Sequence, residues 1–361
     1  MMINYQNNLN IFEKLYKKFL TILYKNKNIY VYEKDFRNLS LPSSVGYEAI
    51  NICNARCSFC GYGKVGADPR KKIKPNLEVL HHTLSVYNES GGGSFTLSPI
   101  LGEITAIPNL IEILEDIRSK YKNIKGLSFY TNAILLDRFD LQKLINSGVS
   151  DIDLSTCLSG KEDYKRVYGV DKFDQVKNNI LNLLEVNKKN NNKVRIKILL
   201  RQDKPFDNFL KGDLYNKIVS YIPKSDVEFL DNQWDDFKGI IKKEDLPKNQ
   251  QFKKQMDKTK PCYALFRKLE ILVDGTIQGC ACRVEPDLWT ENIKSFSNLR
   301  DAWNNKTYNK IRNEWFEGKI PNSCNTCSHY IPYTNLKKGN PKKVSKLIYK
   351  KVKNKLLSYI K

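Results

Sequence analysis

The interpretation of the whole chain depends on one stretch, Asn51-Ile52-Cys53-Asn54-Ala55-Arg56-Cys57-Ser58-Phe59-Cys60-Gly61-Tyr62-Gly63. Its three cysteines are spaced C-x-x-x-C-x-x-C, so three thiolates can converge from one short loop on a single metal centre. Structural zinc normally uses two C-x-x-C pairs or a mixture of Cys and His, and no His follows nearby. The spacing therefore favours a metal centre with one open position. The alternative is three buried or zinc-binding cysteines.

Composition indicates a globular protein of 361 residues, with 41% hydrophobic and 28% charged residues. The chain has no run of eighteen apolar residues and no export signal at residues 1–10, so we expect a cytoplasmic protein. In a reducing compartment, nine cysteines favour metal ligation over disulfides. The net charge of +22 is concentrated near the ends, because residues 337–361 hold ten Lys and no acid. We therefore expect no nucleic-acid partner.

From Val45 onward, apolar runs of strand length alternate with helical apolar periodicity. This order predicts a parallel sheet with helical crossovers, after an N-terminal extension at 1–44 that we expect to pack on the outside. The expected helices begin after Pro75, near Pro108, near Leu136, after an Asp171 cap, and near Phe209. The expected strands are 45–52, 94–98, 126–131, 151–155, 194–200 and 227–230. Six such units are too few to close an eight-stranded barrel.

The cysteine spacing, with Phe59 directly before Cys60, resembles the radical S-adenosylmethionine (SAM) superfamily. This resemblance implies that Cys53, Cys57 and Cys60 hold three irons of a 4Fe-4S cluster, whose fourth iron binds the amino and carboxylate groups of SAM. It also implies an α/β fold, a partial open (β/α)6 barrel, which we place at residues 45–240. A small electron carrier such as flavodoxin or ferredoxin is the expected reductant.

Ligands of parallel β/α sheets lie at the carboxyl ends of the strands, and polar residues recur there in this chain. Gly102-Glu103 resembles the family's Gly-Gly-Glu motif, although Leu101 stands in place of the first Gly. Thr131-Asn132-Ala133 is similar to the family's Thr-Asn-Gly. Each of these residues taken alone is more typical of a turn. The residues that we expect to bind SAM are Gly102, Glu103, Asn132, Ser155 and Arg201.

A second cysteine set follows a polar linker at 241–261. Cys262 and Cys280 flank two short apolar runs joined by Asp274-Gly275, which is a hairpin signal, and Cys324 and Cys327 form a C-x-x-C pair. Zinc is the alternative occupant of four such cysteines. Downstream of a radical SAM core, the pattern resembles the auxiliary-cluster domains called SPASM and twitch. That resemblance implies a twitch-type domain at 262–332 with a 4Fe-4S cluster on these four cysteines. Cys282 either replaces one of them or lies beside the cluster.

The closest resemblance in plan is to the aminocyclitol dehydrogenase type (2-deoxy-scyllo-inosamine dehydrogenase-like). It implies a radical SAM oxidoreductase that acts on a sugar, an aminocyclitol or a nucleotide-sugar, with the auxiliary cluster as electron acceptor. Asp231 and Asp235, which follow the sixth strand, are the candidate general bases. A peptide-modifying SPASM enzyme is the alternative, although the 44-residue extension is short for a leader-binding module. A basic zinc protein without catalysis is the alternative from another class.

The segment 333–361 carries apolar residues at helical spacing, with Lys on the opposite face. Such a basic amphipathic helix can lie on anionic lipid, which predicts a peripheral membrane contact. A helix docked on the barrel with a solvated Lys face is the alternative.

Overall fold

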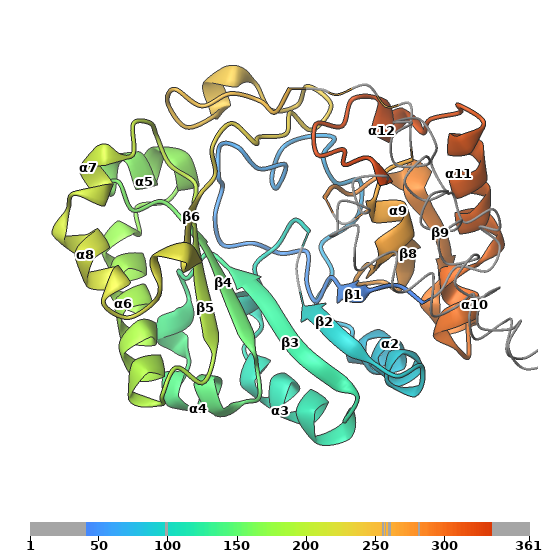
Figure 1. Ribbon diagram of the computed structural model, residues 1–361, viewed down its shortest axis with the longest axis horizontal. Helices are drawn as coiled ribbons and strands as arrows, with labels where there is room; N and C mark the ends of the chain where they lie inside the picture. Colours follow the sequence, from blue (N-terminus) through green and yellow to red (C-terminus); the bar gives the residue numbers. More distant parts are fainter. Residues whose placement is uncertain are drawn as a thin grey trace, which may run out of the picture. The chain divides into compact units, whose positions relative to one another are not determined.

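The sheet of the computed structural model begins with six parallel strands, and Figure 1 shows them with helices along one side. They lie in the spatial order β6-β5-β4-β3-β2-β1, so each strand pairs with the one before it in the chain. This is the architecture expected of a partial (β/α)6 barrel. The strands are β1 (Ser44–Tyr47), β2 (Gly93–Leu97), β3 (Ile124–Thr131), β4 (Asp151–Thr156), β5 (Arg195–Leu200) and β6 (Val227–Phe229).

The structure describes residues 41–97, 100–254, 256, 258, 261–280 and 282–333. Residues 41–331 belong to one compact unit. The proposed N-terminal extension at 1–44, apart from its last four residues, and the amphipathic tail, apart from Tyr333, lie outside the described residues. Among the described helices, none is long and apolar enough to cross a membrane.

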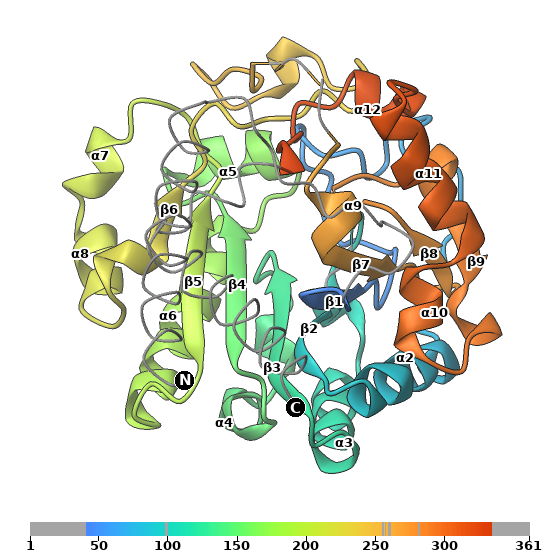
Figure 2. The same ribbon diagram turned by 45° about the vertical axis from the view of Figure 1, so that its right-hand side comes forward.

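Three more strands extend the sheet beyond β1, and Figure 2 shows β7 and β8 beside β1. They are β7 (Lys268–Ile271), β8 (Thr276–Gln278) and β9 (Trp289–Asn292). β7 pairs in parallel with β1, whereas β8 pairs antiparallel with both β7 and β9. The predicted hairpin is confirmed, with Gly275 in the left-handed region that its turn requires (φ 93°). The hairpin therefore continues the core sheet.

Helices connect the strands and cover their outer face. The longer ones are α2 (Leu77–Glu89), α3 (Leu110–Lys120), α5 (Lys161–Tyr168), α6 (Phe173–Lys189) and α11 (Lys306–Phe316). The shorter ones are α4 (Leu141–Asn146), α7 (Asp207–Leu210), α8 (Asp213–Val219), α9 (Ala264–Arg267), α10 (Leu299–Trp303) and α12 (Asn322–Asn325). One-turn 3-10 helices are η2 (Ile104–Ala106), η3 (Leu136–Arg138), η4 (Lys224–Asp226), η5 (Lys243–Asp245), η6 (Pro286–Leu288) and η7 (Ile293–Ser295).

The two faces of the core strands differ in polarity. In β4 the residues Ile152, Leu154 and Thr156 are buried, and the alternating Asp151, Asp153 and Ser155 are partly exposed. Because side chains alternate across a strand, the apolar set packs against the helices while the polar set lines the inner face of the sheet.

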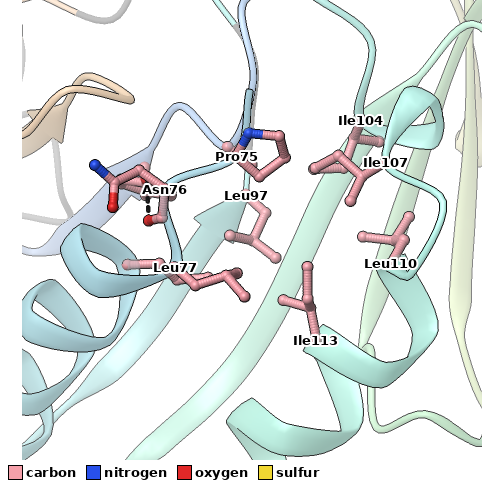
Figure 3. Close-up of a pocket in the computed structure, with 11 residues that line it drawn as sticks. Pro75, Asn76, Leu77, Leu97, Ile104, Ile107, Leu110 and Ile113 are labelled. Carbon is pink, nitrogen blue, oxygen red and sulfur yellow. Dashed lines mark hydrogen bonds between the residues drawn. The ribbon is translucent and has the colours of Figure 1, made fainter. Parts of the chain in front are cut away.

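The helix-covered face is closely packed. Figure 3 shows Leu97 of β2 near Ile104, Leu110 and Ile113, around a void of about 10 Å³. A space of this size lined by apolar side chains is at the lower limit for one water molecule and offers it no polar partners. The void is therefore a packing defect of the core.

Several local predictions differ from the structure. The helix predicted near Leu136 is divided into η3 and α4, because Phe139 is extended and Asp140 caps a new helix by accepting a hydrogen bond from the Lys143 amide. Lys172, rather than Asp171, precedes α6, and no side chain caps that helix. Strand β1 ends at Tyr47, earlier than the predicted residue 52. Helix α5 was not predicted.

Candidate functional site

One cavity of about 440 Å³ opens at the carboxyl ends of the core strands and contains most of the predicted site. Cys53, Cys57 and Cys60 line it together, as the loop after β1 predicts. The predicted SAM-binding residues that also line it are Gly102, Glu103, Asn132, Ser155 and Arg201. The structure thus brings the strand-end residues and the first cysteine set to one space, as expected for a parallel sheet.

The end of helix α5 fixes the cysteine loop. The backbone N–H of Arg56 donates to the carbonyl of Tyr168 (3.1 Å), and that of Ser58 donates to the carbonyl of Val167 (2.9 Å). Gly169 follows with φ 68°, and a Cβ there would lie 2.4 Å from the Arg56 carbonyl oxygen. Only glycine permits both this conformation and this close approach. The sequence carried one signal for this contact, which is Gly169 directly after helix α5. Because helix α5 was not predicted, this signal was not recognised.

The three thiols are electrostatically coupled and buried. Burial raises the pKa of Cys53 to about 12 and also raises the pKa values of Cys57 and Cys60, and the charge of Cys60 adds to the shifts of Cys53 and Cys57. Arg201 partly opposes this effect at Cys57 and Cys60. Thiolates in such a place need a positive partner, and iron bound to all three supplies one. The donor set therefore fits an iron-sulfur cluster.

Glu103 joins the loop after β2 to the end of β3. Its buried carboxylate accepts hydrogen bonds from the Thr131 hydroxyl (2.5 Å), the Asn132 amide (2.7 Å) and both the hydroxyl and the amide of Thr105 (2.7 and 3.0 Å). Burial raises the pKa of Glu103, and these bonds oppose the shift. The carboxylate is thus occupied within the protein and holds the backbone at Thr105 and Asn132.

Asn132 connects this strand end to the cysteine loop. Its side-chain Nδ2 donates to the side-chain oxygen Oδ1 of Asn54 (2.7 Å), and its own Oδ1 accepts from the Ile134 backbone N–H (3.0 Å). The next residue, Ala133, has φ 65°, which disfavours a side chain. The family's Gly at this position fits the same backbone at lower cost.

Arg201 lies against the aromatic wall of the cavity. Its Nε donates to the Ser155 hydroxyl (2.6 Å), and its guanidinium lies 5.5 Å from the Phe59 ring and 5.9 Å from the Trp234 ring. The buried Trp234 indole N–H has no hydrogen-bond partner among the described residues. A polar ligand in the cavity would satisfy it, because buried donors are rarely left unpaired.

The two predicted bases lie in different places. Asp231 forms an ion pair with Lys204, is half exposed, and is not among the residues that line the cavity. Asp235 does line the cavity, but its buried carboxylate binds Arg283 (2.5 Å) and accepts from the Ser328 hydroxyl (2.7 Å). Although burial opposes it, Arg283 holds the pKa of Asp235 below its usual range. Both contacts make Asp235 a weak base and a link to the second cysteine set.

The second cysteine set comes together from three segments. Burial raises the pKa values of Cys262, Cys324 and Cys327, with Cys327 at about 12, and the charge of Cys280 adds to each shift. This mutual influence places the four predicted ligands near one another. Within the described residues, no group of three or more Cys, His, Asp or Glu side chains is arranged to hold a single metal ion. The assignment of these four cysteines as cluster ligands therefore rests on their spacing in the sequence and on the effect of the Cys280 charge on the other three.

Cys282 occupies a position between the two sets. Its backbone N–H lies 3.3 Å from the Cys280 sulfur, and hydrogen bonding from Cys282 lowers the pKa of Cys280. Cys282 also lines the cavity of the first set. Cys282 is thus a neighbour of the ligand Cys280, and it either replaces one of the four predicted ligands or lies beside the cluster.

Several residues that line the cavity were not predicted from the sequence, among them Tyr130, Lys268 and His329. Tyr130 and Lys268 face the inner side of the sheet, and His329 lies two residues after Cys327. Lys268 forms an ion pair with Glu270 (3.0 Å). The pairing of β7 with β1 brings Lys268 to the cavity, and a hairpin pattern carries no signal for that pairing.

Comparisons with known proteins agree with this geometry. A model of the radical SAM superfamily matches residues 47–211. A model of the SPASM iron-sulfur cluster-binding domain matches residues 262–328. The chain therefore carries a radical SAM domain followed by a SPASM domain. These two domains imply a SAM-binding 4Fe-4S cluster, SAM itself and an auxiliary iron-sulfur cluster.

Curated relatives include a GTP 3',8-cyclase of Haemophilus influenzae, which is 28% identical over 161 residues, or 44% of this chain and 46% of the relative. A probable GTP 3',8-cyclase of Methanococcus maripaludis is 31% identical over 143 residues, or 37% of this chain and 43% of the relative. Each match covers less than half of the relative's own length.

Solved structures share the fold over most of the chain. SuiB of Streptococcus suis bound to the precursor peptide SuiA has a TM-score of 0.56 and 16% identity, covering 92% of this chain and 87% of that one. BtrN in complex with AdoMet and 2-DOIA has a TM-score of 0.50 and 15% identity, covering 80% of this chain and 93% of that one. Because the sequence identities are this low, these similarities establish a common fold and nothing more.

Proposed function

We propose that this chain is a radical SAM oxidoreductase that removes two hydrogens from a small polar molecule, such as a sugar, an aminocyclitol or a nucleotide-sugar. The observation that carries the proposal is that one cavity is lined by the first cysteine set, by the strand-end residues and by Cys282 of the second region. A substrate held there would contact the first cysteine set and Cys282, which lies two residues after Cys280 of the second set. Small-molecule sites are typically cavities of about 300–1,000 Å³, and this one falls in that range.

The roles of the residues follow from their contacts. Cys53, Cys57 and Cys60 ligate the first cluster, and Cys262, Cys280, Cys324 and Cys327 ligate the auxiliary one. The backbone around Gly102 and Asn132, held by Glu103, forms one wall of the SAM site. Ser155 and Arg201 form the opposite wall, where Arg201 carries a charge suited to a carboxylate.

The polar inner face of the sheet supports a polar substrate. Tyr130 and Lys268 line the cavity away from the aromatic wall, and Lys268 retains partial exposure while paired with Glu270. A hydroxylated or aminated ring can exchange hydrogen bonds with both groups. Because Asp235 forms an ion pair with Arg283, we assign it a structural role in the cavity wall. Asp231 forms an ion pair with Lys204, so neither acid is well placed to take the substrate proton.

When bound, SAM and the first cluster supply a 5'-deoxyadenosyl radical. The substrate gives up one hydrogen atom from a carbon that bears a hydroxyl or amine, and 5'-deoxyadenosine and methionine are released. The adjacent O–H or N–H loses a proton, and an auxiliary cluster held by Cys262, Cys280, Cys324 and Cys327 would accept the remaining electron. The external reductant would supply the separate electron that cleaves SAM. The substrate therefore loses two hydrogens in total, and one SAM is consumed in each turnover.

The proposal is tested with reconstituted protein, SAM and a chemical reductant, using 2-deoxy-scyllo-inosamine, UDP-sugars and GTP as separate probes. We expect an aminocyclitol or sugar probe to give 5'-deoxyadenosine and a product lighter by two hydrogens, in a ratio of about one to one. In the C324A/C327A variant, 5'-deoxyadenosine should still form while the oxidised product falls at least about tenfold, because the electron has no acceptor.

Three results would contradict the proposal. Turnover of GTP without loss of hydrogen would place the chain with the cyclases that it resembles. Modification of a peptide with no turnover of the sugar probes would favour the SuiB type. Regeneration of SAM in each turnover, with no net loss of hydrogen, would replace oxidation by an isomerisation. Normal oxidised product in C324A/C327A would instead leave the oxidation in place and remove the auxiliary cluster as its electron acceptor.

A further inference from the structure

Arg283 is a buried cation beside the second cysteine set. It follows Cys280 by three residues, and only 2% of its surface is exposed. One terminal nitrogen, Nη2, binds Asp235 (2.5 Å) and lies 3.4 Å from the Thr326 carbonyl oxygen. These contacts satisfy one side of the guanidinium.

The other side of the guanidinium has no acceptor. Nε and Nη1 are buried and have no hydrogen-bond partner among the described residues. The nearest carboxylate oxygen to Nη1, on Glu285, is 3.6 Å away, which is too long for a hydrogen bond. A buried donor without an acceptor loses the hydrogen bond that it would make with water, so this arrangement is unfavourable unless an acceptor is present.

Two cysteines of the second set are close neighbours of Arg283 along the chain or through Thr326, because Cys280 lies three residues before it and the Thr326 carbonyl oxygen lies 3.4 Å from its Nη2. The charge of Arg283 acts on both Cys280 and Cys327, and Thr326, which faces Arg283, directly precedes Cys327. An iron-sulfur cluster on these cysteines would present thiolate and sulfide sulfurs as acceptors in this space. The fixed fork of an arginine can bind a carboxylate on one side and sulfurs on the other, which a lysine cannot do.

We propose that Arg283 donates hydrogen bonds from Nε and Nη1 to the sulfurs of the auxiliary cluster and thereby raises its reduction potential. The inference rests on the auxiliary cluster and its Cys280 and Cys327 ligands. Hydrogen bonds and positive charge near a cluster stabilise its more negative, reduced state. Arg283 is thus a positioning and tuning residue, which makes the cluster a better acceptor for the electron that the substrate releases.

Asp235 connects Arg283 to the cavity. Its carboxylate lines the cavity and binds the Nη2 side of the same guanidinium. The cavity wall therefore holds Arg283 in the orientation that directs its remaining donors toward the cysteines.

The test uses full-length protein in a C53A/C57A/C60A background, so that only the auxiliary cluster is present. A redox titration followed by electron paramagnetic resonance gives its midpoint potential in the parent, R283K, R283Q and a K238Q control. Lys238 pairs with Glu285 at a half-exposed site, so K238Q removes one charge without touching a sulfur. No substrate is needed, so this test is independent of the proposed reaction.

We expect the midpoint to shift to more negative values in R283Q, to shift less in R283K, and to stay within error of the parent in K238Q. A midpoint in R283Q equal to that of the parent would overturn the inference. If R283Q does not retain the auxiliary iron, the midpoint potential of R283K is the deciding measurement. A midpoint potential of R283K equal to that of the parent would then overturn the inference.

Discussion

Gly169 determines whether the first cysteine loop can take its place. Replacing it by Ala puts a Cβ 2.4 Å from the Arg56 carbonyl oxygen, and backbone cannot move aside cheaply. We expect G169A to lose the first cluster, about half of the iron, and its SAM cleavage. Iron content and 5'-deoxyadenosine formation measure both effects.

Gly318 provides the matched control for this substitution. It also follows a helix in the left-handed region (φ 80°), but no atom lies within 4 Å of the position of its Cβ. G318A should cost about 1 kcal/mol of stability and leave both clusters in place. Equal iron content and equal cleavage in G169A and G318A would refute the contact with the loop.

At the residue scale, the cysteine spacing predicted that three residues of one loop lie together, because the ligands of one metal centre must come from a short segment. Cys53, Cys57 and Cys60 line the predicted cavity together with Asn132 and Arg201. The role of Glu103 was not predictable, since its partners Thr131 and Asn132 come from the next strand. Asp231 was expected near the cavity but does not line it. Strand β6 ends at Phe229, and the Asp231 carboxylate forms an ion pair with Lys204.

At the scale of elements, the segment after β6 is joined to the second cysteine region by the buried pair of Asp235 and Arg283. Removing one partner of a buried ion pair costs about 3–5 kcal/mol, because the other charge stays buried and unpaired. We expect D235N to be destabilised by this amount. The double variant D235N/R283Q should lose less than the sum of the single variants.

Urea unfolding of the cluster-free proteins measures these differences. Strict additivity of the two substitutions would show that the residues act independently and would contradict the buried pair.

The same pair has a pH dependence with a defined sign. Arg283 lowers the folded-state pKa of Asp235 below its ordinary value of 3.8, in spite of burial. The stabilisation is therefore complete above the unfolded-state pKa and is lost as the pH falls through the lower folded-state pKa. The stability difference between wild type and D235N should be constant above about pH 5 and shrink toward pH 3. A difference that grows on acidification would contradict the assignment.

The order of elements was predictable, whereas their pairing beyond the core was not. Alternating strands and helices gave β1 to β6 in the expected parallel order, and Asp274-Gly275 gave the β7-β8 hairpin. Nothing local in 268–271 indicates that β7 pairs with β1. Gly46 permits this pairing, because a Cβ there would lie 2.2 Å from the Glu270 carboxylate. Such long-range complementarity is visible only in the folded chain.

At the scale of the whole molecule, the basic segment 333–361 offers a separate prediction. With about 1 kcal/mol for each Lys near an anionic surface, its ten Lys from 337 onward should give binding to anionic vesicles that weakens with salt. Sedimentation with vesicles of phosphatidylserine and phosphatidylcholine compares the full chain with a chain truncated at Lys337. Equal binding by the truncated chain would contradict the role of the segment.

The central claim is that this chain holds two iron-sulfur clusters on two cysteine sets and uses the first to cleave SAM. The most direct test is the iron, sulfide and zinc content of anaerobically reconstituted wild type and C53A/C57A/C60A, together with 5'-deoxyadenosine formation in the presence of dithionite. We predict about eight irons and eight sulfides in wild type, about four of each in the triple variant, and SAM cleavage in wild type alone. About one zinc with no iron in wild type, or 5'-deoxyadenosine formed by the triple variant, would contradict the account.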